Sequence, residues 1–294
     1  MREFIIGTDW LGDCDDVVAL RLMLRAATKG EISIKAIGIN AADEKSVTSL
    51  DGFMNLENVS GIPIGIDHSA TYVNEKATYH GKLAKFASNY TCNEDAQDAV
   101  KLYRKALAEA GDKVEIAEIG FLQVLAGLLL SEPDEYSSLN GIDLVKTKVK
   151  KVWSMAGKWD EQGGKEYNIC CSEASRNAAK TVCEKCPVPV TFLGFEVGYD
   201  VITGSALEKY DYLYTAMCDW GTDSGRSSWD PMLCLLALIG DEQEAGYKTV
   251  VGTASIDENT GANFFKEHKN GLHKYVIKVK ENSYYQNQID RLIK

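Results

Sequence analysis

One stretch near the start of the chain decides its fold, and it is Gly7-Thr8-Asp9-Trp10-Leu11-Gly12-Asp13-Cys14-Asp15-Asp16. The apolar run 3–6 before it predicts a buried strand, and the apolar run 17–24 after it predicts a helix. Its four aspartates are therefore expected on a loop that joins a strand to a helix. In an open α/β sheet such loops lie at the carboxyl edge, where ligands bind.

These four carboxylates fall within eight residues, and like charges this close repel one another unless something compensates them. A hard cation with oxygen ligands would compensate them. The alternative is a solvated acidic turn in which Asp15 or Asp16 caps the following helix. The spacing alone leaves both interpretations open.

Strand and helix patterns alternate along most of the chain. We expect strands at 32–40, 62–66, 113–119, 149–155 and 188–193, and helices at 46–56, 96–110, 122–130, 171–183 and 230–239. This alternation predicts an α/β fold with an open, mostly parallel sheet and helices on both faces.

Two other segments depart from this pattern. The long polar segment 67–81 is expected to be a functional or mobile loop. The tail predicts strands at 249–256, 262–267 and 274–280 and a last helix at 286–293, which would form an antiparallel C-terminal extension. The sequence contains no repeat, low-complexity tract or convincing linker, so residues 1–294 are expected to form a single domain.

Composition excludes several classes of partner. The net charge of −11 argues against nucleic acid and against an anionic membrane surface, because both need a basic face. No apolar run is long enough to span a membrane, and the start of the chain lacks a signal-peptide pattern, which favours a cytoplasmic location. The eight cysteines are typical of reduced residues, and the Cys183/Cys186 pair alone is a weak indication of zinc or redox chemistry.

The acidic stretch resembles the N-terminal signature of the nucleoside hydrolases (nucleoside N-ribohydrolases), in its form D-x-x-x-D-x-D-D followed by an apolar helix. The resemblance implies a calcium ion that binds the catalytic water and the ribose hydroxyls. It implies Asp9 as calcium ligand and general base, Asp15 as a ribose ligand and Asp16 as a calcium ligand. Asp13 is extra, and either supports the ligands or competes for the metal role. Many members have an aspartate where this chain has Gly7.

Two further calcium ligands follow from the same resemblance. The carbonyl of Ile119 falls at the place of a family backbone ligand, although Gln123 and Val124 replace the usual Thr-Asn nearby. Asp230 falls at the place of a distal calcium ligand, and Trp229 replaces the usual His before it. Tryptophan there resembles the purine-preferring branch, where an indole stacks on the base. Alternatively, Asp230 only caps a helix whose first residue is proline.

Substrate contacts are also implied. The motif 166–168 resembles the family's Glu-Phe-Asn motif, which holds the ribose, and the motif 79–81 resembles a His-Gly motif on a loop near the base. Asn40 or the nearby Asp43 matches a family Asn, and Trp10 and Trp159 could form a wall opposite Trp229. The resulting substrate-binding residues are Asp15, Asn40, His80, Trp159, Asp160, Glu166, Asn168 and Trp229.

The resemblance implies a calcium-dependent, purine-preferring nucleoside N-ribohydrolase that acts in purine salvage on a small-molecule ribonucleoside. It also implies a homo-oligomer, either a dimer or a tetramer. The departures at Gly7, Gln123, Val124 and Trp229 keep open a hydrolase-like protein that binds a nucleoside or sugar without turnover. A metal-dependent phosphohydrolase is a third hypothesis, but the sequence has no P-loop pattern to hold a phosphate.

Overall fold

The computed structural model describes residues 1–70 and 79–294. The strands are β1 (Arg2–Thr8), β2 (Ile32–Ile39), β3 (Ile64–Ile66), β4 (Gln97–Asp98), β5 (Val114–Glu118), β6 (Val149–Met155), β7 (Val190–Leu193), β8 (Ile202–Thr203), β9 (Arg226–Ser227), β10 (Tyr247–Ile256), β11 (Asn263–Glu267) and β12 (His273–Lys278). The α-helices are α1 (Asp15–Thr28), α2 (Ser46–Leu56), α3 (His80–Leu83), α4 (Ala99–Glu109), α5 (Gln123–Leu130), α6 (Gly141–Lys148), α7 (Tyr167–Cys170), α8 (Glu173–Lys185), α9 (Phe195–Gly198), α10 (Tyr212–Trp220), α11 (Trp229–Ile239) and α12 (Asn282–Ile293).

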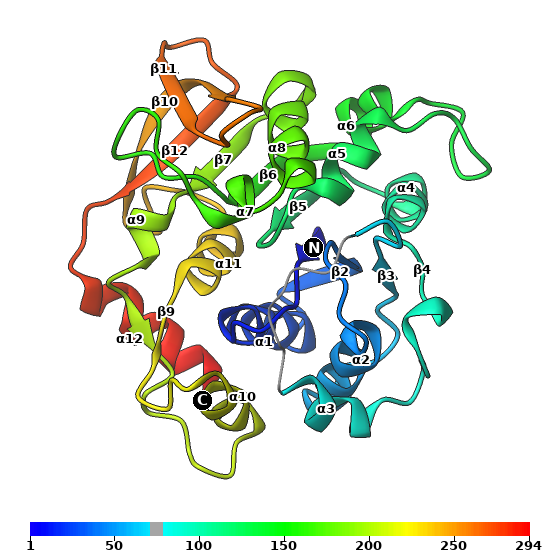
Figure 1. The fold of residues 1–294 in the computed structure, drawn as a ribbon, viewed down its shortest axis with the longest axis vertical. Coiled ribbons are helices and arrows are strands. Elements are labelled where there is room, and N and C mark those ends of the chain that lie inside the picture. The colour runs from blue at the N-terminus through cyan, green and yellow to red at the C-terminus, as the bar shows by residue number, and fades with distance from the viewer. Residues whose placement is uncertain (71–78) are drawn as a thin grey trace.

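Ten of these strands form one sheet in the order β11-β10-β12-β7-β6-β5-β1-β2-β3-β4. Neighbouring strands from β12 to β4 run parallel, whereas β10 pairs antiparallel with both β12 and β11. The predicted α/β class with antiparallel C-terminal strands is therefore confirmed (Figure 1). The tail strands extend the main sheet itself, because β12 pairs with β7.

β1 lies near the middle of the sheet with helices on both faces, so its residues 4–8 are buried. The core on one face includes side chains from α1, α2, α11 and α12, and the core on the other face includes side chains from α4, α5, α6 and α8. Figure 1 shows where these helices lie around the sheet. After β1 the chain continues into α1 on one face, and after β5 it continues into α5 on the opposite face. The loops after β1 and β5 therefore diverge and leave a crevice between them.

Helices α1 and α11 pack against each other beside this crevice. Neither helix begins as the capping interpretations require. Cys14 is the N-cap residue of α1 and makes no side-chain capping bond, so Asp15 and Asp16 lie in the first turn. Ser228 is the N-cap residue of α11, which places Asp230 second and Pro231 third in that helix. The alternative in which these aspartates serve as helix caps is therefore wrong.

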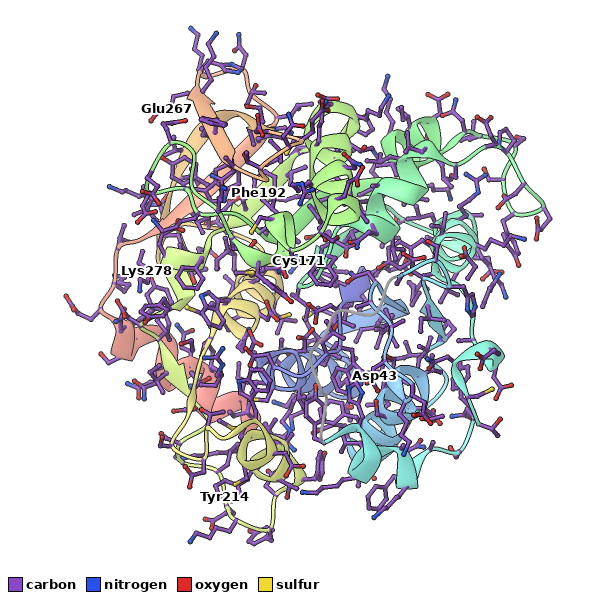
Figure 2. All side chains as sticks on the ribbon, viewed as in Figure 1. Asp43, Cys171, Phe192, Tyr214, Glu267 and Lys278 are labelled. Carbon is purple, nitrogen blue, oxygen red and sulfur yellow. The ribbon has the colours of Figure 1, made fainter. Side chains whose placement is uncertain are left out.

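The structure also bears on the predicted helices, the polar loop, membrane spans and the cysteines. The patterns missed α6 and α10, whose short sequences lack a long apolar period. Much of the predicted loop at 67–81 lies outside the described residues, which leave out 71–78. Side chains fill the space between the ribbons (Figure 2). No helix among the described residues is long and apolar enough to cross a membrane. All eight cysteines are free thiols.

Candidate active site

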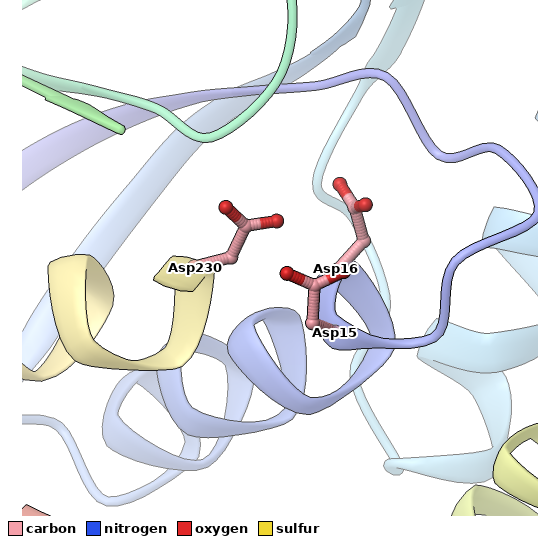
Figure 3. A group of neighbouring side chains, drawn as sticks. All are labelled: Asp15, Asp16 and Asp230. Carbon is pink, nitrogen blue, oxygen red and sulfur yellow. The ribbon is translucent and has the colours of Figure 1, made fainter. Parts of the chain in front are cut away.

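Three buried aspartates meet where the N-termini of α1 and α11 converge. Asp15 and Asp16 come from the first turn of α1, and Asp230 comes from the first turn of α11. Each offers a carboxylate oxygen that lies within 4.8 Å of the oxygens offered by the other two. Their side chains point toward a common space (Figure 3). We call these three residues the carboxylate cluster.

When ionised, the carboxylate cluster would carry more negative charge than the described residues around it neutralise. Burial raises the pKa of Asp15, Asp16 and Asp230 well above the usual aspartate value, and the charges of neighbouring aspartates raise it further. The positive ends of two helix dipoles oppose this effect only in part. Among the described residues, no Lys, Arg or His forms an ion pair with any of the three. Clustered carboxylate oxygens are the donors that a hard divalent cation prefers, so these residues fit such an ion.

A cavity of about 270 Å³ opens above the carboxylate cluster. This volume is slightly below the range of about 300–1,000 Å³ that is usual for small-molecule sites. One part of its lining is acidic and another part is aromatic. The lining residues are Asp9, Leu11, Asp13, Asp15, Asp16, Ile119, Met155, Glu166, Tyr167, Asn168, Phe195, Trp220, Arg226, Trp229 and Asp230. The structure thus brings together most of the residues that the resemblance selected.

The loop after β1 brings further carboxylates to this cavity. Asp16 accepts a hydrogen bond from the Thr8 hydroxyl, so the end of β1 and the start of α1 are joined. Asp9 is half-buried and its Oδ1 lies 3.3 Å from the backbone nitrogen of Leu11, which donates to it. The charge of Asp9 is also one cause of the raised pKa of Asp16. These contacts place the predicted general base beside the predicted metal ligand.

Glu166 and Asn168 are buried and line the cavity from the short helix α7. Glu166 accepts hydrogen bonds from the backbone N–H of Asn168 at 2.7 Å and of Gly157 at 2.9 Å. Burial raises the pKa of Glu166 to about 7. Asn168 Nδ2 donates to the carbonyl of Met155 at 3.0 Å and contacts the carbonyl of Ile119 at 3.5 Å. The amide therefore ties the ends of β5 and β6 together at the cavity.

Sequence reasoning missed Arg226, which lines the same cavity. Its Nε donates to Asp13 Oδ1 at 2.9 Å, and its Nη2 donates to Asp13 Oδ2 at 2.5 Å. Asp13 is therefore the carboxylate partner of Arg226 and lies outside the carboxylate cluster. The two residues are 213 positions apart in the chain, so only their closeness in space reveals the pair.

Trp229 also lines the cavity and is half-buried. Its indole Nε1 donates to the carbonyl of Phe195 at 2.8 Å, and the two rings stack with centroids 5.3 Å apart. The guanidinium carbon of Arg226 lies 4.8 Å from the centroid of the indole. Stacking of Trp229 on a nucleobase stays a prediction. Phe195, Tyr167 and Trp220 add aromatic surface that sequence reasoning did not assign to the site.

Trp159 and Asp160 do not line this cavity, in contrast to the prediction. Trp159 is buried in the core, where its Nε1 donates to the carbonyl of Ala156 and its ring stacks against Tyr275. Asp160 is exposed and pairs with Lys158 at 2.8 Å. Both residues line a separate cavity beside β12. The reason is the packing of the indole against β7 and β12, which turns this loop away from the carboxylate cluster.

Asn40 and His80 are fully buried and also lie outside the lining of the cavity. Asn40 Oδ1 accepts a hydrogen bond from the backbone N–H of Phe121 at 2.9 Å, which joins the loops after β2 and β5. His80 Nδ1 lies 3.1 Å from Asp43 Oδ1 (Asp43 is labelled in Figure 2), and its ring stacks on Trp10. Burial lowers the pKa of His80. In this structure both side chains support loops, and their contact with a substrate stays a prediction.

The structure also explains why glycine occupies position 7. Gly7 lies opposite Glu118 in the parallel pairing of β1 with β5. A Cβ atom on Gly7 would lie 1.7 Å from Glu118 Oε2, so any larger residue would collide with that carboxyl group. Glu118 is completely buried, and burial raises its pKa to about 8. A neighbouring strand therefore supplies an acid close to the place where the signature usually has one.

Comparison with solved structures identifies the class of fold. The chain is similar to an inosine-uridine preferring nucleoside hydrolase from Bacillus anthracis, with 14% sequence identity, a TM-score of 0.71 and coverage of 100% of this chain and 99% of that chain. It is also similar to the type III effector protein XopQ in complex with adenosine diphosphate ribose, with 14% identity, a TM-score of 0.67 and coverage of 99% and 93%. The effector protein XOO4466 gives 14% identity, a TM-score of 0.65 and the same coverage of 99% and 93%. No family model and no curated protein sequence matches the chain. The chain has the nucleoside hydrolase fold.

Proposed function

We propose that this protein is a calcium-dependent nucleoside N-ribohydrolase that prefers purine nucleosides and releases ribose and the free base. The observation that carries this proposal is the carboxylate cluster, which lies uncompensated at the floor of a cavity with an aromatic wall. Oxygen-rich sites of this kind suit calcium, and aromatic side chains suit a nucleobase. The nucleoside hydrolase fold is consistent with this assignment.

In this proposal Asp9, Asp16, Asp230 and the carbonyl of Ile119 hold the calcium ion, since all four line the same cavity. When bound, the ion lowers the pKa of a water molecule and holds that water in position. Asp15, Glu166 and Asn168 bind the ribose hydroxyl groups through their carboxylate and amide groups. The carboxylates also favour the positive charge that develops on the sugar as the glycosidic bond breaks.

The reaction itself needs one proton transfer on the side of the sugar. A water oxygen forms the new bond to C1′ of the ribose while the bond from C1′ to the base nitrogen breaks. Asp9 accepts the proton that the water loses and so acts as general base. The electron pair of the broken bond leaves with the base, which takes up a proton to become the free base.

A second candidate function is binding of a nucleoside or sugar without turnover. Two of the similar structures are effector proteins, and one of them is described in complex with adenosine diphosphate ribose. The sequence identity of 14% is low enough that the two proteins can share a fold and differ in catalytic activity. This alternative predicts saturable binding with no release of ribose.

One panel of substrates separates these functions. The purified protein is incubated with calcium and with inosine, adenosine, guanosine, uridine or cytidine, and free ribose is measured. We expect turnover that is faster for the purine nucleosides and is lost when calcium is removed by a chelator. Binding of these nucleosides and of adenosine diphosphate ribose is measured in parallel by calorimetry. Binding without ribose release would favour the second function, and neither binding nor release would exclude both.

Three finer assignments belong to the same proposal, namely a role in purine salvage, a cytoplasmic location and a homo-oligomeric state of two or four chains. Faster turnover of uridine than of inosine would overturn the purine preference while leaving the hydrolase assignment intact. Cell fractionation tests the location. Light scattering of the purified protein tests the oligomeric state.

A further inference from the structure

When the glycosidic bond of a nucleoside breaks, the departing base becomes negatively charged and needs stabilisation. The electron pair of the bond remains on the ring nitrogen, so negative charge develops on the base in the transition state. A donor aimed at that charge accelerates the reaction because it interacts more strongly with the transition state than with the substrate. The many carboxylates of this cavity stabilise a cationic sugar but disfavour an anionic base.

Few side chains in the cavity could stabilise the base. Six carboxylates line it, and Arg226 is the one cationic side chain among the described residues of the lining. The indole N–H of Trp229 is already bound to the carbonyl of Phe195, so it is not free to serve the base. Both carboxylate oxygens of Glu166 accept backbone N–H groups. His80 is buried outside the cavity.

We propose that Arg226 is a catalytic residue that stabilises the negative charge of the departing base; this role rests on the proposed hydrolase function. Its guanidinium lies 4.8 Å from the centroid of Trp229, within the aromatic wall where a flat base would bind. Asp13 holds it there through Nε and Nη2. Among the described residues, Nη1 has no hydrogen-bond partner, so its N–H groups are available to a nitrogen or oxygen acceptor on the base.

Arginine suits this role because it remains charged and presents several donors in a fixed plane. It does not give up a proton during the reaction. The base leaves with the electron pair, and the guanidinium stabilises the resulting anion. Solvent water then supplies the proton that forms the neutral base, and the hydroxide that remains is neutralised by the proton that Asp9 took from the attacking water. Asp13 is a positioning residue in this scheme, since it acts only by orienting Arg226.

The test compares two substrates that differ in how much help the leaving group needs. Inosine has a poor leaving group, whereas 4-nitrophenyl riboside releases a nitrophenolate that is stable without assistance. We expect Arg226→Met to lower kcat for inosine by about 10²–10³-fold, the usual cost of removing one preorganised donor. Turnover of 4-nitrophenyl riboside should fall by less than about tenfold. Equal losses with both substrates would indicate a structural role and overturn this proposal.

A double variant separates two effects of removing Arg226, namely the loss of its guanidinium group and the exposure of an unpaired Asp13 carboxylate. Arg226→Met leaves the Asp13 carboxylate unpaired near the carboxylate cluster, and Asp13→Asn in the same chain removes that charge. We expect the double variant to keep the selective loss with inosine. Recovery of inosine turnover in the double variant would show that the unpaired Asp13 caused the defect, and would overturn the role of Arg226.

Two more variants complete the design. Arg25→Met is the matched control, because Arg25 has similar exposure (28% against 26%) and also pairs with a carboxylate, but lies in the last turn of α1. It should leave the ratio of kcat for the two substrates unchanged.

Tyr167 also lines the cavity and is the alternative donor to the base. A loss of inosine turnover that appears in Tyr167→Phe and is absent in Arg226→Met would overturn the proposal. If the wild-type protein hydrolyses neither substrate, the proposed function and this role both fail; equal losses in an active enzyme remove only this role.

Discussion

A single buried acid, Glu115, lies at the amino edge of the central strands, the carboxylate cluster lies at their carboxyl edge, and the two differ in their partners. At the amino edge, Glu115 of β5 has an exposed side-chain fraction of only 3% and pairs with Arg2 at 2.6 Å. Lys150 and the indole N–H of Trp153 also donate to it, at 3.3 and 2.8 Å. At the carboxyl edge, the carboxylate cluster has no ion-pair partner among the described residues.

The pKa shifts record this difference. The cationic and N–H partners of Glu115 outweigh its burial and lower its pKa, whereas burial and like charges raise the pKa of every member of the carboxylate cluster. A buried carboxylate with its own partners stabilises the fold, but removal of one partner is costly. A buried carboxylate without cationic or N–H partners destabilises the fold, unless a ligand supplies the opposite charge. The comparison therefore gives Glu115 a structural role, and it supports the proposal that the carboxylate cluster binds a cation.

The largest difference between the two edges should appear in catalysis. Asp9→Asn removes the proposed general base while keeping its shape, so the single-turnover rate should fall by about 10²–10⁴-fold with little change in substrate binding. Rapid-quench measurement of ribose release from inosine tests this. Glu115→Gln is the matched control at the amino edge and should keep the wild-type rate when folded. A loss below about tenfold in Asp9→Asn would contradict its role as the base.

Calcium should stabilise the protein through the carboxyl edge alone. At a concentration of 100 times Kd, a bound ligand adds about 2.7 kcal/mol to the free energy of unfolding. Asp16→Asn and Asp230→Asn should each lose most of this calcium-dependent gain, whereas Glu115→Gln should retain it. Thermal unfolding with calcium and with a chelator measures the effect. A full calcium response in Asp230→Asn would remove that residue from the ligand set.

Without calcium, Glu115→Gln and Asp230→Asn should differ in their effect on stability. Glu115→Gln weakens charged hydrogen bonds to Arg2 and Trp153 and should cost about 1–3 kcal/mol in the free energy of unfolding. Asp230→Asn removes one of several repelling charges, so the calcium-free protein should become no less stable. Urea denaturation in a chelator compares them. A destabilised Asp230→Asn together with an unaffected Glu115→Gln would reverse our interpretation of the two edges.

The last effect concerns pH. An acid whose pKa is raised in the folded state favours folding at low pH, and this contribution is lost as the pH rises through the folded pKa. The carboxylate cluster, Glu166 at about 7 and Glu118 at about 8 all belong to this group. Glu115 has the opposite sign: its contribution is complete above the ordinary glutamate value of 4.5 and is lost only as the pH falls through its lowered pKa.

Between pH 5 and 8 the raised acids should therefore dominate, because Glu115 no longer titrates in that range. The calcium-free protein should lose stability as the pH rises, by about 1.4 kcal/mol per pH unit for each acid that is protonated in the folded state and ionised in the unfolded state. The calcium-dependent gain should increase over the same range, since ligand carboxylates must lose their protons to bind a metal. Thermal unfolding at several pH values tests both trends. A calcium-free protein that becomes more stable with rising pH would contradict the uncompensated state of the carboxylate cluster.

Local sequence was enough to predict the class of fold and one half of the site. The alternating apolar periods identified β1, β2, β5, β6 and β7, because burial on both faces of a sheet produces short continuous apolar runs. The acidic stretch after β1 indicated the carboxyl edge, because Asp9, Asp15 and Asp16 follow a strand directly. Asp230 required a resemblance, since nothing in its own surroundings distinguishes it from a helix cap.

The rest of the site depends on contacts that local patterns do not contain. Strand order and register bring Glu118 opposite Gly7, and packing of the two-stranded β8–β9 segment brings Arg226 to Asp13. The same packing forces hold Trp159 in the core, although its position in the sequence suggested the site. Sequence periodicity shows which face of an element is apolar, but it does not show which distant element covers that face. The sequence by itself determined the α/β class and the acidic edge, and only the tertiary structure decided which charges at that edge are neutralised and which are left for a ligand.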